Sequence, residues 1–315
     1  MKGYPIIRDI RNGCLQDELP LHLAIGMFDG LHLGHQRVIQ SCLQAKQKNG
    51  GFSAVLSFNP HPRKFFPDKT PPERIMPTDC QALHLLEMGI DKVIQQKFDQ
   101  KIADIEAPNF LQFLKQYIPQ LQSIHIGSNF CFGKRRSGNA GLLLKQASQY
   151  QMEVAVKEPY YHQGTPISST RIREHLRKGQ MEAANTLLGY SYYAIGVPES
   201  GKGMGKKIGF PTVNLCWEPE NRPPLGVYQV QVNYGEKPIS ENSLPAIANY
   251  GLRPTLEKSL HPKLEIHFEK KPTLEADVPL KVEWLRFIRP EQKFPSMDAL
   301  SQQIKRDIIS VFPDW

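Results

Sequence analysis

The 315-residue chain has no uninterrupted apolar run near the roughly 18 residues that a bilayer-spanning helix needs. Its first residues, MKGYPIIRDIRNG, carry charge, but no long apolar stretch follows them. This pattern argues against a secretory signal. We therefore expect a cytoplasmic protein without a membrane partner.

Paired cysteines are also missing. The five cysteines are scattered and form no CxxC pair; they are Cys14, Cys42, Cys80, Cys131 and Cys216. A disulfide framework or a zinc ribbon would need regular spacing, so neither is indicated. We expect reduced and mostly buried thiols.

A long block of one charge is absent as well, although the net charge is +8. Basic residues are spread along the chain, and the densest cluster, Lys134-Arg135-Arg136, is only three residues long. Nucleic acid and small polyanions are the two partner classes that such a charge suits. The dispersed pattern favours nucleotides, and no nucleic-acid partner is expected.

The length of 315 residues is enough for about two domains. The content of 40% hydrophobic and 22% charged residues is that of a globular protein with buried cores. Up to residue 189, strand-like runs such as 21–28 and 52–58 alternate with helix-like spacing, as in 34–48 and 78–88, where Thr78 is expected to cap the helix. Such alternation predicts an α/β fold with parallel strands and right-handed crossovers. Ligands bind such sheets at the carboxyl ends of the strands.

After Gly189 the pattern changes to short β-rich runs separated by Pro- and Gly-rich turns. This texture predicts a small antiparallel barrel. A last helix over 298–311 places Leu300, Ile304, Ile308 and Val311 on one face, so we expect it to pack on the barrel. The predicted domains are 1–189 and 190–315.

The strongest local motif is GMFDGLHLGH, residues 26–35, where a strand turns on glycine and enters a helix. Unpaired N–H groups and the positive dipole end of a helix suit phosphate. His32 and His35 flank Gly34, and imidazoles there can donate to a reacting phosphate as its charge develops. Two surface histidines on a turn are the plain alternative, which the glycine between them makes less attractive.

A second motif, ISSTRIR at 167–173, puts hydroxyl residues at a helix start. Alone, these residues would be read as helix caps. Arg173 lies one turn after Ser169, and the combination of hydroxyls, N–H groups and a guanidinium can grip a triphosphate.

The C-terminal half carries GKGMGKKIGFPTVN, residues 201–214, which is neither a Walker A loop nor a dinucleotide fingerprint. Its glycines free the backbone to wrap phosphates, and its lysines supply charge. Thr212 and Asn214 point to one face of an extended strand, where a hydroxyl and an amide oxygen can hold Mg²⁺. On the alternating strand 263–268, Glu265 and His267 face away from Leu264 and Ile266; a solvent-facing Glu265 is the plain alternative.

The first two motifs, in this order on an alternating fold, resemble the HxGH nucleotidyltransferase superfamily. With SFNPHP (57–62) and GSNFCFG (127–133), they resemble the adenylyltransferase half of bacterial bifunctional riboflavin kinase/FAD synthetases. The glycine-rich segment, ANYGLRPT (248–255) and IRPEQKF (288–294) are similar to a flavokinase domain. The resemblance covers nearly the whole chain.

That resemblance implies ATP-dependent phosphorylation of riboflavin to FMN in the C-terminal half, and transfer of AMP from ATP to FMN in the N-terminal half, giving FAD and pyrophosphate. It implies Mg²⁺ as cofactor and ATP, riboflavin and FMN as small-molecule partners; self-association is left open. His32, His35, Arg173 and Glu265 would be the catalytic residues, with Glu265 as general base on the riboflavin 5′-hydroxyl.

The implied binding residues fall into four groups. ATP at the adenylyltransferase site would meet Gly26, Phe28, Asp29, Gly30, His32, His35, Ser168, Ser169, Thr170 and Arg173, and FMN would meet Asn59, His61 and Asn129. ATP at the kinase site would meet Gly201, Gly203, Gly205, Lys206, Thr212 and Asn214, the last two also holding the metal. Flavin at the kinase site would meet Asn249 and Arg253.

The chain departs from the family pattern at three places: Asn129 stands where Asp is frequent, Lys206 where Arg is usual, and 274–278 lacks a Tyr-Gly turn. Two other functions compete. An adenylyltransferase for another acceptor, or an RNA-aminoacylation relative, would leave the second half unexplained, and neither a KMSKS-like loop nor an RNA-binding appendage is seen. A non-catalytic flavin or nucleotide regulator would not need both histidines, Arg173 and Glu265.

Overall fold

The computed structural model describes residues 6–12, 19–66, 70–199, 212–234, 243–252, 262–268 and 278–312. Contacts divide the chain into two compact units, Met1–Ser169 and Thr170–Trp315. The helices between 170 and 188 thus belong with the second unit. The domain boundary at Gly189 stays a prediction.

The first unit is built on a six-stranded parallel sheet among its described residues, with the order β1-β4-β3-β2-β5-β8. The strands are β1 (Ile6–Ile7), β2 (Leu21–Ile25), β3 (Phe52–Asn59), β4 (Lys92–Lys97), β5 (Leu121–Gly127) and β8 (Glu153–Lys157). From β2 the chain proceeds first to one side of the sheet and later to the other. The reversal places a topological switch point between β2 and β5, where such sheets bind ligands.

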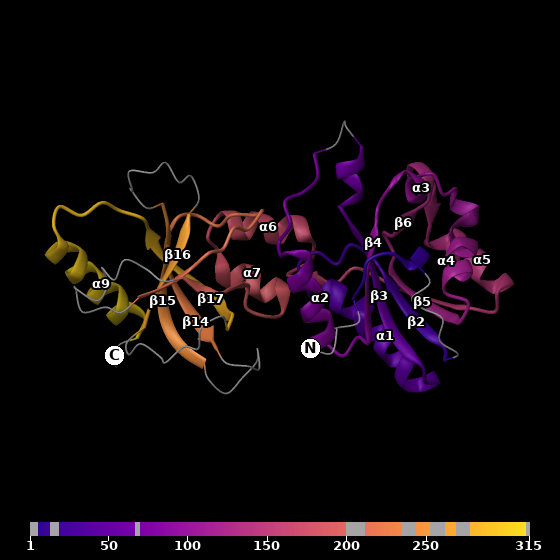
Figure 1. Cartoon of the computed structure of the whole chain (residues 1–315), viewed down its shortest axis with the longest axis horizontal. Helices are drawn as coiled ribbons and strands as arrows, with labels where there is room; N and C mark the ends of the chain where they lie inside the picture. Colours follow the sequence, from indigo (N-terminus) through magenta and orange to yellow (C-terminus); the bar gives the residue numbers. More distant parts are fainter. Residues whose placement is uncertain are drawn as a thin grey trace. The chain divides into compact units, whose positions relative to one another are not determined.

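Helices cover both faces of this sheet (Figure 1). They are α1 (Leu33–Asn49), α2 (Thr78–Glu87), α3 (Gln100–Ala103), α4 (Phe110–Tyr117) and α5 (Ala140–Gln149). Leu111 of α4 and Leu143 of α5 join Leu23 and Ile124 in one apolar core, while α1 packs on the other face. The predicted Thr78 cap is wrong, because Pro77 is the N-cap of α2 and makes no side-chain cap bond.

Short elements complete the first unit. They are the 3₁₀ turns η1 (Ile10–Asn12), η2 (Pro62–Phe65), η3 (Ala107–Asn109) and η4 (Lys134–Arg136), and the ribbons β6 (Cys131–Phe132) with β7 (Gly138–Asn139) and β9 (Tyr161–His162) with β10 (Thr165–Pro166). The predicted α/β fold with parallel strands is confirmed.

The second unit contains an antiparallel, nearly closed barrel, as predicted, and also two helices that the predicted domain boundary placed in the first domain. Helix α6 (Ser169–Arg177) runs into it from the first unit, and α7 (Met181–Leu188) ends at Gly189 in the left-handed conformation. The described strands have the order β11-β17-β14-β15-β16-β13-β12. Their bounds are β11 (Tyr193–Gly196), β12 (Pro198–Glu199), β13 (Thr212–Leu215), β14 (Gly226–Asn233), β15 (Ser243–Gly251), β16 (Lys263–His267) and β17 (Leu280–Pro290).

Aromatic rings fill the barrel interior. Trp284 is fully buried and packs against Trp217, Tyr228 and Tyr250 at ring-centroid distances of 4.9, 4.5 and 5.8 Å. Helix α7 is fastened to this core because Asn185 Nδ2 donates to the Trp284 carbonyl over 2.8 Å.

Helix α9 (Met297–Val311) packs on the outer face of the barrel. Its Ile304 and Ile308 lie in one apolar cluster with Val227 of β14 and Ile247 of β15, and Leu300 and Val311 pack against that cluster. The predicted packing face of this helix is confirmed.

Of the four cysteines in the described residues, only Cys42 is buried; Cys80 is half-buried, and Cys131 and Cys216 are exposed. The expectation of mostly buried thiols is therefore wrong, while all four are free as expected. Cys14 lies outside the described residues. Within the described part of the chain, no helix is long and apolar enough to span a membrane.

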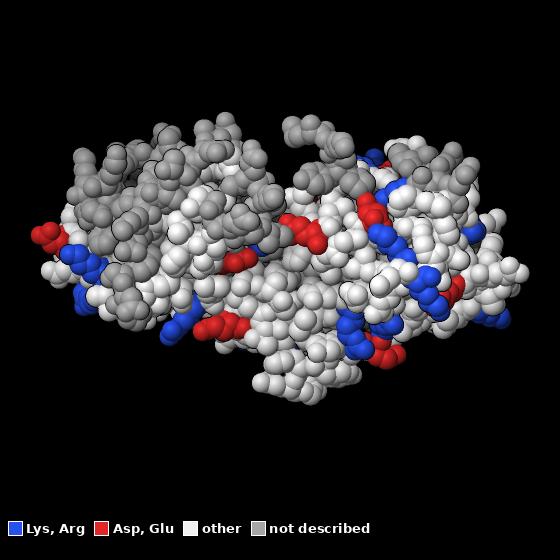
Figure 2. All heavy atoms as spheres, turned by 90° about the horizontal axis from the view of Figure 1, so that it is seen from below, with Lys and Arg blue, Asp and Glu red and all other residues white. Residues whose placement is uncertain are grey.

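Basic and acidic side chains are interspersed on the face seen in Figure 2, in keeping with their dispersal along the sequence. On the described part of this face, blue and red groups lie among neutral ones rather than in one field of a single sign.

Candidate active sites

The turn after β2 has a backbone that few sequences can adopt. Phe28, Gly30 and Leu31 all have positive φ, at 50°, 78° and 41°. A side chain at Gly30 would also collide with Ile75, since a Cβ there would lie 2.8 Å from its Cδ1. At Gly26, a Cβ would lie 3.0 Å from the Phe28 ring. Glycine is therefore needed at position 30 and leaves little room for a side chain at position 26, and the turn carries the chain directly into α1.

The two histidines of this turn lie face to face. His32 is the N-cap of α1, and its Nδ1 accepts the His35 backbone N–H over 3.3 Å. The two rings stack with centroids 3.6 Å apart and planes 18° apart, and Phe28 meets His35 edge-on at 5.4 Å. Gly34 allows a close approach beside them, because a Cβ there would lie 3.1 Å from the His32 ring. The arrangement presents two imidazoles and a helix N-terminus together, as predicted.

Asp29 ties this turn to two other segments. Its buried carboxylate accepts the Ile75 N–H over 3.0 and 3.2 Å, and its backbone carbonyl accepts the Ser169 hydroxyl over 2.9 Å. Ser169 is the first residue of α6, so the ISSTRIR segment begins next to the histidine turn, with Ser168 just before it. Thr170 and Arg173 follow along α6.

The predicted FMN residues lie at the carboxyl ends of β3 and β5, the two strands that flank β2. Asn59 ends β3 and precedes a cis peptide bond to Pro60, and His61 Nδ1 accepts the Arg63 N–H over 3.1 Å. Asn129 follows β5 and is exposed; a Cβ at Gly127 would lie 3.1 Å from its Oδ1. Since β3, β2 and β5 are adjacent and parallel, these residues and the histidine turn share one edge of the sheet.

A cation–π contact at this edge of the sheet could not be predicted from the sequence. The Arg37 guanidinium lies 5.5 Å from the centre of the Tyr160 ring, and a Cβ at Gly34 would lie 3.9 Å from the Tyr160 Cβ. Tyr160 therefore covers the first turns of α1. The sequence signal nearest to this contact is the aromatic pair Tyr160-Tyr161, which begins seven residues before the ISST segment and matches no motif.

In the second unit, three predicted kinase residues meet across adjacent strands. Asn214 of β13 lies directly opposite Glu265 of β16, which in turn lies opposite Asn249 of β15. Thr212 lies opposite His267 one step along the same face. The predicted shared face of Thr212 and Asn214, and of Glu265 and His267, is thus confirmed. Asn214 is only 4% exposed, whereas Glu265 is half-buried.

This polar face is the outer face of the barrel. Ile247 is two residues from Asn249 and packs against α9, so α9 covers the same surface further along. Burial lowers the pKa of His267, with Glu265 and Asp307 opposing that effect. The residues that alternate with these along the strands, including Val213 and Ile266, face the barrel interior and are buried.

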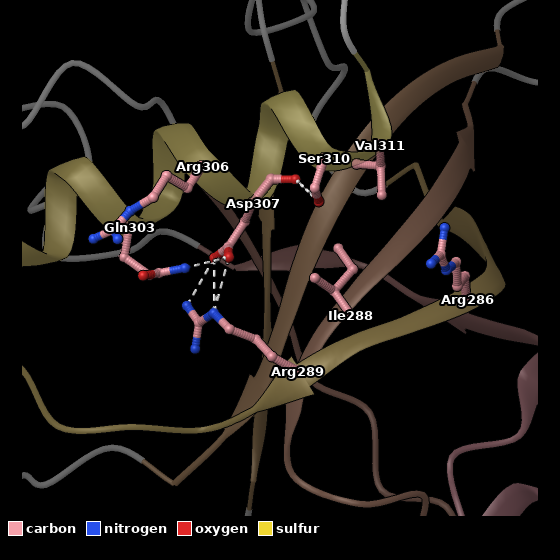
Figure 3. Close-up of a pocket in the computed structure, with 8 residues that line it drawn as sticks. All are labelled: Arg286, Ile288, Arg289, Gln303, Arg306, Asp307, Ser310 and Val311. Carbon is pink, nitrogen blue, oxygen red and sulfur yellow. Dashed lines mark hydrogen bonds and ion pairs between the residues drawn. The ribbon is translucent and has the colours of Figure 1, made fainter.

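An ion pair fastens α9 to the end of β17. Arg289 donates to both carboxylate oxygens of Asp307 over 2.8 to 3.0 Å, and Gln303 Nε2 donates to the same carboxylate over 2.8 Å (Figure 3). A pocket of about 380 Å³ lies beside this pair and is lined by Arg286, Ile288, Arg289, Gln303, Arg306, Asp307, Ser310 and Val311. Its residues have no common spacing in the sequence, so no sequence pattern indicates this pocket.

Several predicted residues lie outside the described residues, namely Gly201, Gly203, Gly205, Lys206 and Arg253. Among the described residues, no group of three or more His, Cys, Asp or Glu side chains could hold a metal ion. The oxygen donors of Thr212 and Asn214, beside the Glu265 carboxylate, are nevertheless the donor types that Mg²⁺ prefers.

Fold and sites define a nucleotidyltransferase-like α/β unit joined to a kinase-like β-barrel. A family model described as FAD synthetase matches residues 15–171, and one described as riboflavin kinase matches 188–311. Bifunctional riboflavin kinase/FMN adenylyltransferases are similar over most of their length. Those from Escherichia coli K12 and Haemophilus influenzae are 32% and 34% identical, covering 96% and 91% of this chain and 95% and 91% of their own.

The chain belongs to the bifunctional riboflavin kinase/FMN adenylyltransferase family. This confirms the resemblance drawn from the motifs. A solved structure described as a macrolide-efflux protein from Streptococcus pneumoniae has the same fold, with a TM-score of 0.82 and 25% identity over 98% of each chain.

Proposed function

We propose that this chain makes FAD from riboflavin in two ATP-dependent steps, each in its own unit. The observation that carries the proposal is that each compact unit gathers its own set of motif residues. The histidine turn, Asn59 and Asn129 share one sheet edge in the first unit, and Asn214, Glu265 and Asn249 form one row in the second.

In the first unit, a phosphate oxygen of FMN attacks the α-phosphorus of ATP, and the bond to pyrophosphate breaks. The paired imidazoles of His32 and His35 donate to the α-phosphate oxygens as negative charge grows there. The α1 N-terminus adds N–H groups and a positive dipole end. Ser168 and Ser169, the last residues of this unit, hold the outgoing phosphates. The phosphate-binding roles of Thr170 and Arg173, which belong to the second unit, stay predictions.

In the second unit, Glu265 takes the proton from the riboflavin 5′-hydroxyl as that oxygen attacks the γ-phosphorus of ATP. Asn249, opposite Glu265, and Arg253 hold the flavin. Thr212 and Asn214 would hold Mg²⁺, which neutralises phosphate charge when bound. Positioning and charge neutralisation are the main requirements for this transfer, so one base beside a metal site suffices.

The kinase assignment is tested by Glu265→Gln. Gln keeps the shape and one acceptor oxygen but cannot take the proton, and general-base loss costs about 10²–10⁴ in rate. We expect FMN formation to fall by that factor while adenylation of supplied FMN is unchanged. The matched control is Glu283→Gln, on a barrel strand where Glu283 pairs with Lys281 at 3.0 Å. Near-normal FMN formation by Glu265→Gln would remove Glu265 from the mechanism.

A further inference from the structure

Four polar side chains form a continuous hydrogen-bonded chain inside the first unit. His22 Nε2 lies 3.1 Å from the Gly50 carbonyl, and His22 Nδ1 lies 2.7 Å from Ser123 Oγ. The same hydroxyl lies 2.8 Å from His125 Nε2, and His125 Nδ1 lies 2.9 Å from Ser41 Oγ. All four side chains are buried. Neither histidine belongs to the motifs of the adenylyltransferase site.

The Gly50 carbonyl fixes every proton in this chain. A carbonyl only accepts, so His22 Nε2 carries a hydrogen, and in the neutral ring Nδ1 accepts from the Ser123 hydroxyl. Ser123 has then used its one proton and must accept from His125 Nε2–H. His125 Nδ1 is left to accept from Ser41. With both imidazoles neutral, each donor in the series meets one acceptor.

These four hydrogen-bonded side chains join the three elements whose ends form the adenylyltransferase site. His22 lies on β2, which leads into the histidine turn. Ser123 and His125 lie on β5, which ends just before Asn129. Ser41 lies in α1, whose first turn carries His35. These bonds therefore fix the helix that carries His35 against the two strands on either side of the switch point.

We propose that Ser41, His125, Ser123 and His22 form a positioning relay that holds α1 against β2 and β5 in the placement that adenylyl transfer needs. The inference rests on the proposed adenylyltransferase site. None of the four residues touches the reacting atoms. They act through the placement of His35 and of the α1 N-terminus, and small displacements of reacting groups can cost about 10² in rate.

The sheet offers a matched control. Ser53 on β3 and Ser123 on β5 both lie beside His22, one on each side of β2. Both are buried, but Ser53 donates to Asp91 over 2.8 Å and takes no part in the relay. Ser53→Ala and Ser123→Ala thus remove one buried hydroxyl each, and only the second interrupts the relay.

The experiment measures FAD formation from supplied FMN, and FMN formation from riboflavin, in the full chain. We expect Ser123→Ala to lower kcat for FAD formation by about 10-fold or more with little change in KM, and to leave FMN formation unchanged. Ser123→Thr, which keeps the hydroxyl, should recover most of the lost rate. Ser53→Ala should lower the melting temperature without lowering kcat.

Two results would overturn the relay: a normal kcat for Ser123→Ala, or an equal loss of kcat in Ser53→Ala, which would mean general loosening of the core. If Ser123→Ala does not fold, Ser41→Ala and Ser41→Thr make the same comparison at the α1 end. His35→Ala separates the relay from the site itself, since full FAD formation by that variant would show that the proposed site is wrong whatever the relay does.

Discussion

The buried histidines of the first unit should make its stability depend on pH between 5 and 7.5. Burial lowers the pKa of His125 from 6.5 to about 4, and nearby His22 and Lys157 add to the effect. Burial also lowers the pKa of His22, against the raising effects of the Gly50 carbonyl and Glu153. In the unfolded chain both rings titrate near the usual value, so the unfolded state binds more protons below about pH 6.5. The two neutral histidines therefore make their full contribution to the free energy of unfolding above that pH, and this contribution falls as the pH drops towards 4.

The magnitude follows from the two pKa values of His125. A group with a pKa of 6.5 unfolded and about 4 folded contributes a loss of about 2 kcal/mol at pH 5, relative to pH 7.5. Paired carboxylates do not interfere, because the pKa values of Asp9, Asp91 and Asp99 are lowered below 3.8. Cys42, which packs beside His22, has a pKa raised to about 12 and stays neutral.

The assay is urea unfolding at pH 7.5 and pH 5.0, followed by far-UV ellipticity. Tryptophan fluorescence follows the second unit alone, because Trp217, Trp284 and Trp315 all belong to it. His125→Gln is the comparison, since Gln keeps a donor near Ser123 but does not titrate. Its free energy of unfolding should change with pH by about 2 kcal/mol less than that of the parent chain. An identical pH dependence of the two proteins would refute the reasoning.

Three further predictions concern His32, the ion pair between Arg289 and Asp307, and the second unit expressed by itself. His32→Ala should lower the rate of FAD formation by about 10²–10³, so that FMN accumulates. An equal loss of FMN formation in chromatographic assays would contradict the assignment of the two reactions to separate units. Arg289→Met leaves the buried Asp307 carboxylate without its charge partner and should lower the unfolding free energy of the second unit by about 3 kcal/mol in urea titrations; a change below about 0.5 kcal/mol would show that the pair does not hold α9. A fragment of residues 170–315 should fold and phosphorylate riboflavin. A fragment of 190–315 should melt at a lower temperature, since it lacks the Asn185 bonds to the barrel, and equal melting temperatures would count against that.

Much of the fold could be predicted from the sequence because local patterns and tertiary structure agree. The parallel sheet follows from the alternation of strands and helices, and the packing face of α9 follows from Ile304 and Ile308. Thr78 failed as a cap because hydroxyl residues mark helix starts only approximately, and Pro77 takes the cap position. Cysteine burial failed because residue type says little about which face a thiol occupies, as the exposed Cys131 and Cys216 show.

The candidate sites were predictable where residues sit close together along the chain, as with His32 and His35. Contacts between distant segments were not. Asn214, Glu265 and Asn249 meet only through strand register, and the contact between Arg37 and Tyr160 has no sequence pattern. The His22–Ser123–His125–Ser41 relay could not be predicted for the same reason, because its hydrogen-bonded neighbours are separated by up to 101 residues and each one alone is an ordinary core residue.

The most direct test of the central claim is incubation of the purified full chain with riboflavin, ATP and Mg²⁺, with riboflavin, FMN and FAD separated by chromatography over time. FMN should appear first and FAD should follow, and supplied FMN should give FAD without riboflavin. Absence of FAD from supplied FMN, or absence of FMN from riboflavin, in folded protein would contradict it.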